Sequence, residues 1–184
     1  KVPVVGAILS AAKQIPVERS SAGANRSLSV AREVMDQGGA VIIYPEGTLT
    51  RDPDLWPMRG RTGAARLALQ TGAPVVPVAH WGANELFPRY AKKLHIFPRK
   101  TARVVAGPPV DLSEFIGQPL TKTVLEEATT RILDAVTDLL AGLRGEQPPA
   151  QRWDPAVRGQ NATGRNFEVS PPADLPPTSP EDKP

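Results

Sequence analysis

A short apolar run that ends in a turn of distinctive composition constrains this chain most. Residues 40–43 (Ala-Val-Ile-Ile) follow the Gly38-Gly39 break, and they are too few and too β-branched for a helix, so we expect a central strand. Residues 44–48 (Tyr-Pro-Glu-Gly-Thr) come directly after it and carry one isolated carboxylate, Glu46. Ligands of open α/β sheets bind beyond the carboxyl ends of strands, so this turn is a candidate site. Taken alone, such a turn is more often an ordinary loop.

The order of the expected elements indicates an α/β fold. Helices are expected at residues 4–12, from Asn25 or Ser27 to Asp36, from Thr62 or Gly63 onward, and from a Thr123–Glu126 capping box to Gly142 or Gly145. Strands are expected at residues 15–17, 40–43, 74–79 and 103–106. Helices and strands that alternate at this spacing predict a mostly parallel central sheet covered by helices on both faces.

Composition divides the chain near Gly145. Residues 1–145 contain the expected helices and strands, whereas residues 146–184 are rich in proline, glycine and polar side chains and have few apolar residues. We therefore predict one folded domain, 1–145, followed by a disordered tail, 146–184. The tail holds six acidic and four basic residues, so the whole-chain charge of +3 leaves about +5 on the folded part. This excess favours anionic partners.

Several classes of protein are disfavoured by composition. The chain has no cysteine and two histidines, which excludes a disulfide framework, a thiolate zinc site and a histidine-rich metal cluster, so we expect no metal and no cofactor. No apolar run approaches the length of about 20 residues that a membrane span requires. No glycine-rich loop ends in Lys-Ser or Lys-Thr, and no nucleic-acid-binding motif is present, so we expect no nucleic acid partner.

Four segments together resemble the 1-acylglycerol-3-phosphate acyltransferase family. They are Lys1, Pro3 and Gly6 with residues 14–19 (Gln-Ile-Pro-Val-Glu-Arg), residues 44–48, residues 61–66 (Arg-Thr-Gly-Ala-Ala-Arg) and residues 73–79 (Ala-Pro-Val-Val-Pro-Val-Ala). Their order and spacing agree with the family over roughly residues 1–143, and the combination is more specific than any one segment. The resemblance implies a membrane-associated enzyme that moves a fatty acyl group from a thioester to the free hydroxyl of lysophosphatidic acid, giving phosphatidic acid.

The resemblance also implies roles for individual residues. Arg19 is expected to bind the phosphate of the acceptor, with Arg61 as a second contact, because a guanidinium can bond two phosphate oxygens. Gly47 and Thr48 are expected to line the pocket. Glu46 is expected to orient Arg19, Arg61 or a histidine by charge-assisted hydrogen bonds, and so to support catalysis without touching the anion. Where the family commonly has arginine, the chain has Leu49, and its next arginine, Arg51, is the replacement candidate.

The catalytic base of the family is not found in this sequence. The family's first block, a histidine followed after four residues by an aspartate, is expected upstream of Lys1, and neither His80 nor His95 has this spacing. His80 is more often a structural imidazole at such a position, and His95 is expected to be exposed. We therefore interpret the chain as an N-terminally truncated enzyme that is inactive by itself. The alternative is a non-catalytic lipid- or phosphate-binding fragment or an inactive homologue.

Partners follow from the same resemblance. We expect a lysophospholipid acceptor and an acyl thioester donor, coenzyme A or acyl carrier protein, at the cytoplasmic face of the cell membrane, with the protein bound peripherally. Nothing in the sequence indicates an oligomeric state. Residues 85–100 interleave aromatic and basic side chains, which suits either an anionic bilayer or a connection whose aromatic rings pack inward, and the second is slightly favoured.

Overall fold

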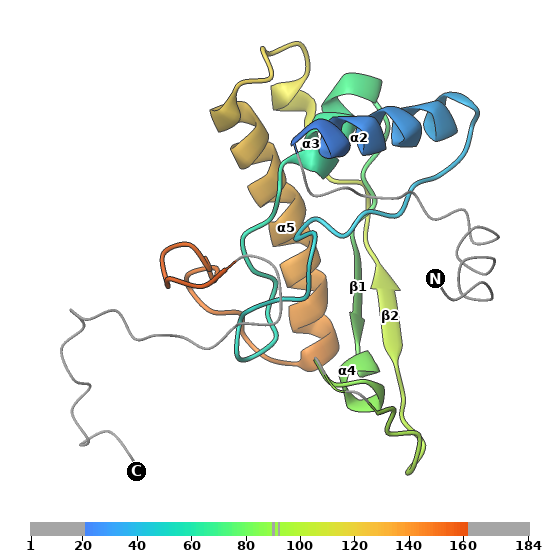
Figure 1. Cartoon of the computed structure of the whole chain (residues 1–184), viewed down its shortest axis with the longest axis vertical. Helices are drawn as coiled ribbons and strands as arrows, with labels where there is room; N and C mark the ends of the chain where they lie inside the picture. The colour runs from blue at the N-terminus through green and yellow to red at the C-terminus, as the bar shows by residue number, and fades with distance from the viewer. Residues whose placement is uncertain (1–20, 90, 92, 162–184) are drawn as a thin grey trace.

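The computed structural model describes residues 21–89, 91 and 93–161, which form a small sheet with a long helix along it and shorter helices at its ends (Figure 1). In chain order the elements are α2 (Ser21–Asp36), α3 (Gly63–Thr71), β1 (Val78–Trp81), α4 (Ala83–Leu86), β2 (Arg103–Ala106), the 3-10 helix η1 (Ser113–Phe115) and α5 (Lys122–Arg144). The elements expected at residues 4–12 and 15–17 lie outside the described residues, as do Arg19 and residues 162–184.

The sheet is antiparallel in the part of the chain that the structure describes. It consists of β1 and β2, with Val78 opposite Ala106 and Trp81 opposite Arg103. The mixed class of helices and strands is confirmed, but the expected parallel pairing is not found among these residues. A parallel return needs a crossover that runs back along the sheet, usually a helix. The connection between β1 and β2 contains only the four-residue α4, so the chain turns back directly.

The prediction of a strand at residues 40–43 is wrong for the described structure. This segment belongs to no strand, and Ile42 is 88% exposed. A strand requires a neighbouring strand that accepts hydrogen bonds from its amides and donates hydrogen bonds to its carbonyls. No described strand lies beside this segment, so its apolar sequence alone does not create a sheet position.

Proline explains why β1 begins later than expected. The predicted strand at residues 74–79 contains Pro74 and Pro77, which have no N–H to donate, and the ladder starts only at Val78. The preceding residues still pair through their carbonyls: Gly107 donates to Pro77 at 2.9 Å and Val110 donates to Val75 at 2.9 Å. The strand at residues 103–106 is confirmed as β2.

Helix ends follow the expected signals in most cases. α3 begins at Gly63 after the N-cap Thr62, and α2 ends at Asp36 as predicted, although α2 begins at Ser21, earlier than expected. The capping box is wrong, because the N-cap of α5 is Thr121, whose hydroxyl accepts from the Val124 amide at 3.3 Å. The last helix ends at the second of the two predicted positions, where Gly145 has a φ of 68°.

Helix α5 is the centre of the packing. Its apolar side contributes to two clusters of buried side chains, one with α3 and η1 and one with β1. The first cluster contains Ala65, Ala68, Leu112, Phe115, Ala128 and Ile132, and the second contains Trp56, Ala79 and Leu140. α5 therefore covers one face of the sheet. On the opposite face Val78 and Val104 are 49% and 68% exposed, so in the described structure the sheet is not covered on both faces as predicted.

The C-terminal end of α5 is fixed by stacking. The guanidinium carbon of Arg144 lies 4.1 Å from the ring centroid of Trp56 and 4.4 Å from that of Trp81. Arg144 also donates to the carbonyl of Asp54 at 2.7 Å. One planar cation thus joins the helix, the loop that carries Trp56 and the end of β1.

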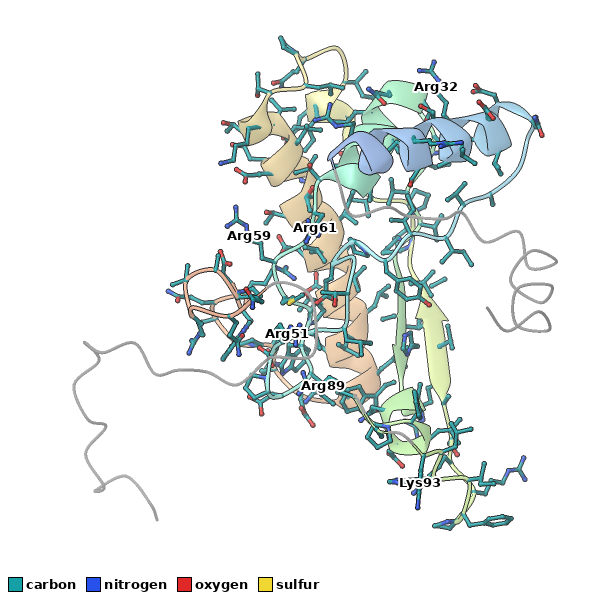
Figure 2. The ribbon with its side chains drawn as sticks, in the orientation of Figure 1. Arg32, Arg51, Arg59, Arg61, Arg89 and Lys93 are labelled. Carbon is teal, nitrogen blue, oxygen red and sulfur yellow. The ribbon has the colours of Figure 1, made fainter. Side chains whose placement is uncertain are left out.

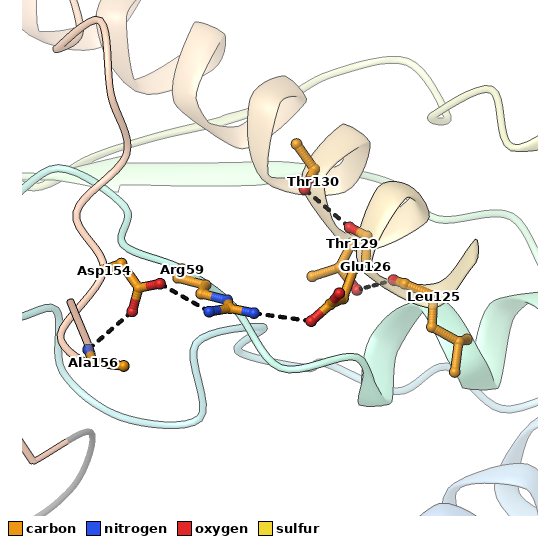
Figure 3. Close-up of polar contacts among 7 residues, drawn as sticks. All are labelled: Arg59, Leu125, Glu126, Thr129, Thr130, Asp154 and Ala156. Carbon is orange, nitrogen blue, oxygen red and sulfur yellow. Dashed lines mark hydrogen bonds and ion pairs between the residues drawn. The ribbon is translucent and has the colours of Figure 1, made fainter. Parts of the chain in front are cut away.

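Residues 146–161 pack against the folded domain, so the predicted disorder is wrong for this part of the tail. The amide of Arg59 donates to the carbonyl of Trp153 at 2.8 Å. The Arg59 side chain bonds both Asp154 and Glu126, at 2.8 Å each, and so links the tail to α5 (Figure 3). Few apolar residues are needed when ion pairs and backbone bonds hold a segment, which is why composition did not reveal this packing.

Candidate functional site

The turn at residues 44–48 has a defined backbone geometry. The amide of Gly47 donates to the carbonyl of Tyr44 at 3.0 Å, and Gly47 has a φ of +68°, in the left-handed region that favours glycine. The amide of Arg61 donates to the carbonyl of Pro45 at 2.7 Å. The turn is therefore held against residues 59–61, which are remote from it in sequence.

The structure brings Gly47 and Arg61 together. A Cβ atom at Gly47 would lie 3.2 Å from Cδ and 3.4 Å from Nε of Arg61, so this side chain rests on the glycine backbone. Arg61 is exposed and is labelled in Figure 2. An exposed guanidinium next to an open backbone is an arrangement that can bind an anion, and Thr48 lies next in the chain with a further hydroxyl.

Glu46 is directed into the loop that follows the turn. Its Oε2 accepts a hydrogen bond from the amide of Met58 at 3.0 Å, and its carboxyl group also bonds the hydroxyl of Thr50. Among the described residues Glu46 forms no ion pair. The expected bond to Arg61 is therefore not found, and the expected bond to Arg19 lies outside the described residues.

Burial raises the pKa of Glu46 to about 7, because the charged carboxylate is poorly hydrated in this loop. The hydrogen bond from Met58, the bond to Thr50 and the positive charge of Arg152 oppose this increase, and the negative charge of Asp52 adds to it. The carboxyl group of Glu46 therefore loses its proton at a higher pH than an ordinary glutamate does.

Thr50 links Glu46 to the rest of the loop. The hydrogen bond between Thr50 and Glu46 lowers the pKa of the carboxyl group, so it favours the charged form. Oγ1 of Thr50 also lies 2.6 Å from the carbonyl oxygen of Trp56 and accepts from the Asp52 amide at 3.2 Å.

Arg51 lies in a different position from Arg61. Its side chain is 4% exposed, and its amide donates to Sδ of Met58 at 3.3 Å. Asp52, also buried, accepts from the amides of Asp54 and Trp56 at 2.8 and 3.3 Å. This placement makes Arg51 part of the folded loop and does not favour a contact with a phosphate in solvent.

Three residues of the site were not predicted from the sequence. Thr50 and Met58 bond Glu46, and Arg152 influences its charge from a segment that was predicted to be disordered. Arg152 bonds Asp134 and, at 3.1 Å, the hydroxyl of Thr137 on α5. No pattern around Arg152 indicates this position, because it depends on how residues 146–161 return to the helix.

The two histidines lie apart from this arrangement. His80 is exposed on the sheet face that α5 does not cover, and His95 is exposed as predicted. No group of side chains among the described residues could hold a metal ion. Two surface hollows, one along α5 and η1 and one beside α4, are lined by neither the turn nor Arg61.

Comparison with known proteins finds a family model that is similar to the N-terminal part of the chain. Residues 1–81 match the family model described as acyltransferase. The chain is 32% identical over 88 residues to the chloroplastic 1-acyl-sn-glycerol-3-phosphate acyltransferase BAT2 of Brassica napus, covering 47% of this chain and 25% of that protein. The family-model match relates residues 1–81, less than half of the chain, to the acyltransferase family.

Other relatives carry the same name. The 1-acyl-sn-glycerol-3-phosphate acyltransferase of Cocos nucifera is 26% identical over 166 residues, which cover 89% of this chain and 48% of that protein. The protein of this name from Borreliella burgdorferi is 26% identical over 136 residues, or 72% and 52% of the two chains. The chain is thus similar to proteins of this name. It spans between a quarter and about half of these relatives' length, and no solved structure is significantly similar to it.

Proposed function

We propose that this chain is the acceptor-binding part of an acyltransferase that converts lysophosphatidic acid to phosphatidic acid. The observation that carries the proposal is the contact of exposed Arg61 with Gly47, in a segment that matches the acyltransferase family. The names of the relatives supply the acceptor class. Arg61 and the open turn bind the phosphate, and Arg19 adds a second guanidinium.

The reaction requires no cofactor beyond its two substrates. The free hydroxyl of the acceptor attacks the thioester carbonyl, an ester C–O bond forms, and the C–S bond breaks. The hydroxyl proton passes to a base, and the released thiolate takes up a proton. The base is the histidine that the family resemblance expects upstream of Lys1, and the donor is a thioester of coenzyme A or of acyl carrier protein.

Glu46 has a positioning role in this proposal. Its carboxyl group bonds the Met58 amide and thereby fixes the distance between the turn and the loop at residues 50–58. Gly47 lies next to it and in contact with Arg61, so loss of the carboxyl group displaces the phosphate site without removing a phosphate ligand. The protein acts peripherally at the cytoplasmic face of the membrane, where its acceptor resides.

The test is an acyl-transfer assay on a version extended upstream to include the histidine and aspartate, run beside residues 1–184. The extended protein should acylate lysophosphatidic acid, and the present chain should bind it without turnover. Arg61→Ala should raise KM for the acceptor by about tenfold or more, as expected for one lost charge-assisted bond pair. Arg66→Ala, a nearby arginine that does not contact Gly47, is the matched control.

Glu46→Ala should lower kcat and raise KM together, whereas Asp138→Ala on the exposed side of α5 should change neither. Asp52 is unsuitable as a control, because its buried carboxylate holds the loop. An extended protein that binds the lysolipid but transfers no acyl group from either donor would identify a non-catalytic lipid-binding protein. One that binds no phosphorylated lipid would contradict the proposal.

A further inference from the structure

The connection between β1 and β2, residues 82–102, projects from the end of the molecule opposite α2 and α3 (Figure 1). Its two ends approach each other closely, since a Cβ at Gly82 would lie 2.1 Å from the carbonyl oxygen of Thr101. Lys100 and Glu85 lie 3.9 Å apart near the same place. The base of the projection is therefore closed.

Two sets of hydrogen bonds hold the projection in position. Arg89 donates through Nη1 to the carbonyl oxygens of Thr50 and Asp52, at 2.7 and 2.8 Å. The amide of His95 donates to the carbonyl of Leu86 at 2.8 Å. The guanidinium of Arg89 is thus bonded within the protein. The residues of the projection beyond Arg89 extend from an anchored base.

The tip of the projection, residues 93–99 (Lys-Leu-His-Ile-Phe-Pro-Arg), is exposed throughout. Leu94, Ile96 and Phe97 are 60%, 61% and 87% exposed. The favoured expectation that the aromatic side chains of this region pack inward is therefore wrong for Phe97. Apolar side chains this exposed and this close in sequence mark an interaction surface.

The surroundings of the tip are cationic. Residues 86–102 contain five lysines and arginines and no acidic residue. Figure 2 shows Lys93 at the far end of the projection. On one side, Leu86, Ile96 and Phe97 line a hollow of about 440 Å³, with Arg99 and Lys100 also in its wall. Apolar and basic groups thus share one surface.

We propose that the tip at residues 93–99 binds an anionic lipid bilayer. Leu94, Ile96 and Phe97 enter the interfacial region, while Lys93 and Arg99 contact lipid phosphates. Charge favours this occupant over a second copy of the chain, because two tips that each carry Lys93 and Arg99 and no acidic residue repel each other. In choosing a lipid surface, the inference rests on the proposed function, since a lysolipid acceptor resides in a membrane.

The experiment is vesicle flotation of the full chain without acyl donor, using phosphatidylcholine vesicles with and without about one third phosphatidylserine. The chain should bind only the anionic vesicles, and less as the salt concentration rises. The double variants Ile96→Ser with Phe97→Ser, and Lys93→Glu with Arg99→Glu, should each weaken binding by about tenfold or more. Circular dichroism checks that both variants are folded.

Matched controls carry equivalent changes away from the tip. Ile116→Ser with Val157→Ser removes two side chains that are 70% and 80% exposed, and Arg26→Glu with Lys122→Glu reverses two exposed charges. Both should bind vesicles as the unchanged chain does. Equal binding by the tip variants and the controls, or no binding to anionic vesicles, would overturn the inference.

Analytical sedimentation distinguishes a second copy of the chain from a lipid bilayer as the partner of the tip. If the Ile96→Ser, Phe97→Ser variant dissociated a dimer and left vesicle binding unchanged, the tip would be an interface between copies and the lipid assignment would be wrong. Because phosphatidylserine is not the acceptor and no acyl donor is present, failure here leaves the acyl-transfer proposal intact. Conversely, the chain could bind vesicles while its extended version transfers no acyl group. That result would support lipid binding by the tip and contradict the proposed acyl transfer.

Discussion

Glu46 shows at the residue scale how burial decides the chemistry of a side chain. The sequence presents it as an isolated carboxylate in a turn, and the resemblance to acyltransferases implied a charged partner. In the structure its partners are the Met58 amide and the Thr50 hydroxyl. With no ion pair among the described residues, the cost of burial dominates and the carboxyl group retains its proton to about pH 7.

The stability of the protein should therefore depend on the charge of Glu46. The folded-state pKa of this acid is raised above 4.5, so the folded chain holds the proton more tightly and loses stability as pH rises from 4.5 through about 7. Glu46→Gln keeps the shape and can still accept from the Met58 amide, so it should be more stable than the unchanged chain at pH 8 by up to about 3 kcal/mol and nearly equal at pH 4.5.

Urea unfolding at both pH values measures the Glu46→Gln difference. Asp138→Asn on the exposed side of α5 is the control, and it should show no such dependence on pH. Parallel pH profiles for the Glu46→Gln variant and the unchanged chain would mean that Glu46 does not titrate in this range.

Gly82 is the residue at which the backbone leaves least room. It has a φ of +100°, and an added Cβ would meet the Thr101 carbonyl oxygen at 2.1 Å. Gly82→Ala should therefore destabilise the protein by more than about 2 kcal/mol, through both strain and overlap. Gly72 has a φ of +69°, and a Cβ added there would meet nothing within 4 Å. Gly72→Ala should therefore cost about 1 kcal/mol of stability, from backbone strain without overlap. Equal losses in thermal unfolding would show that the connection moves to relieve the overlap.

At the scale of elements, the 146–161 segment changes the boundary of the folded unit. Arg59 joins Asp154 to Glu126, and Arg152 joins the segment to Asp134 and Thr137 of α5. Each exposed ion pair contributes little by itself. Together with the Arg59–Trp153 backbone bond they order a segment whose composition resembles a linker.

Two truncations test this boundary. A chain that ends after residue 161 should unfold at the same urea concentration as the full chain, since residues 162–184 have few apolar side chains to bury. A chain that ends after residue 145 should be less stable by about 1–3 kcal/mol, because Arg59 loses two partners and α5 loses the Arg152 contacts. Coinciding unfolding curves for the two truncations would mean that the segment contributes nothing to the fold.

At the scale of the whole molecule, α5 is the structural axis. It contacts α3, β1 and β2, whereas the 82–102 connection meets the rest of the chain mainly at its base. No described helix is long and apolar enough to cross a membrane. The molecule thus has a packed centre and a projecting end, and these two parts should differ in local stability.

Hydrogen exchange should report this difference. The amides of α5 near Ile132 and Leu140, which belong to the two buried clusters, should exchange only through the largest opening of the protein. Amides of residues 93–99 should exchange far faster, apart from His95, which is bonded to Leu86. Adding anionic vesicles should slow exchange at the tip alone. Protection at the tip equal to that in α5 would contradict the proposed division.

Local signals in the sequence predicted β2, the start of α3, the C-terminal end of α5 and the resemblance to acyltransferases. The two helix ends depend on signals within a few residues, such as a threonine before the first turn or a glycine after the last. The folded structure alone showed the sheet's antiparallel pairing, the burial of Arg51, the raised pKa of Glu46 and the return of residues 146–161. Each of these depends on which distant groups become neighbours, and hydration, pairing and charge are properties of that neighbourhood.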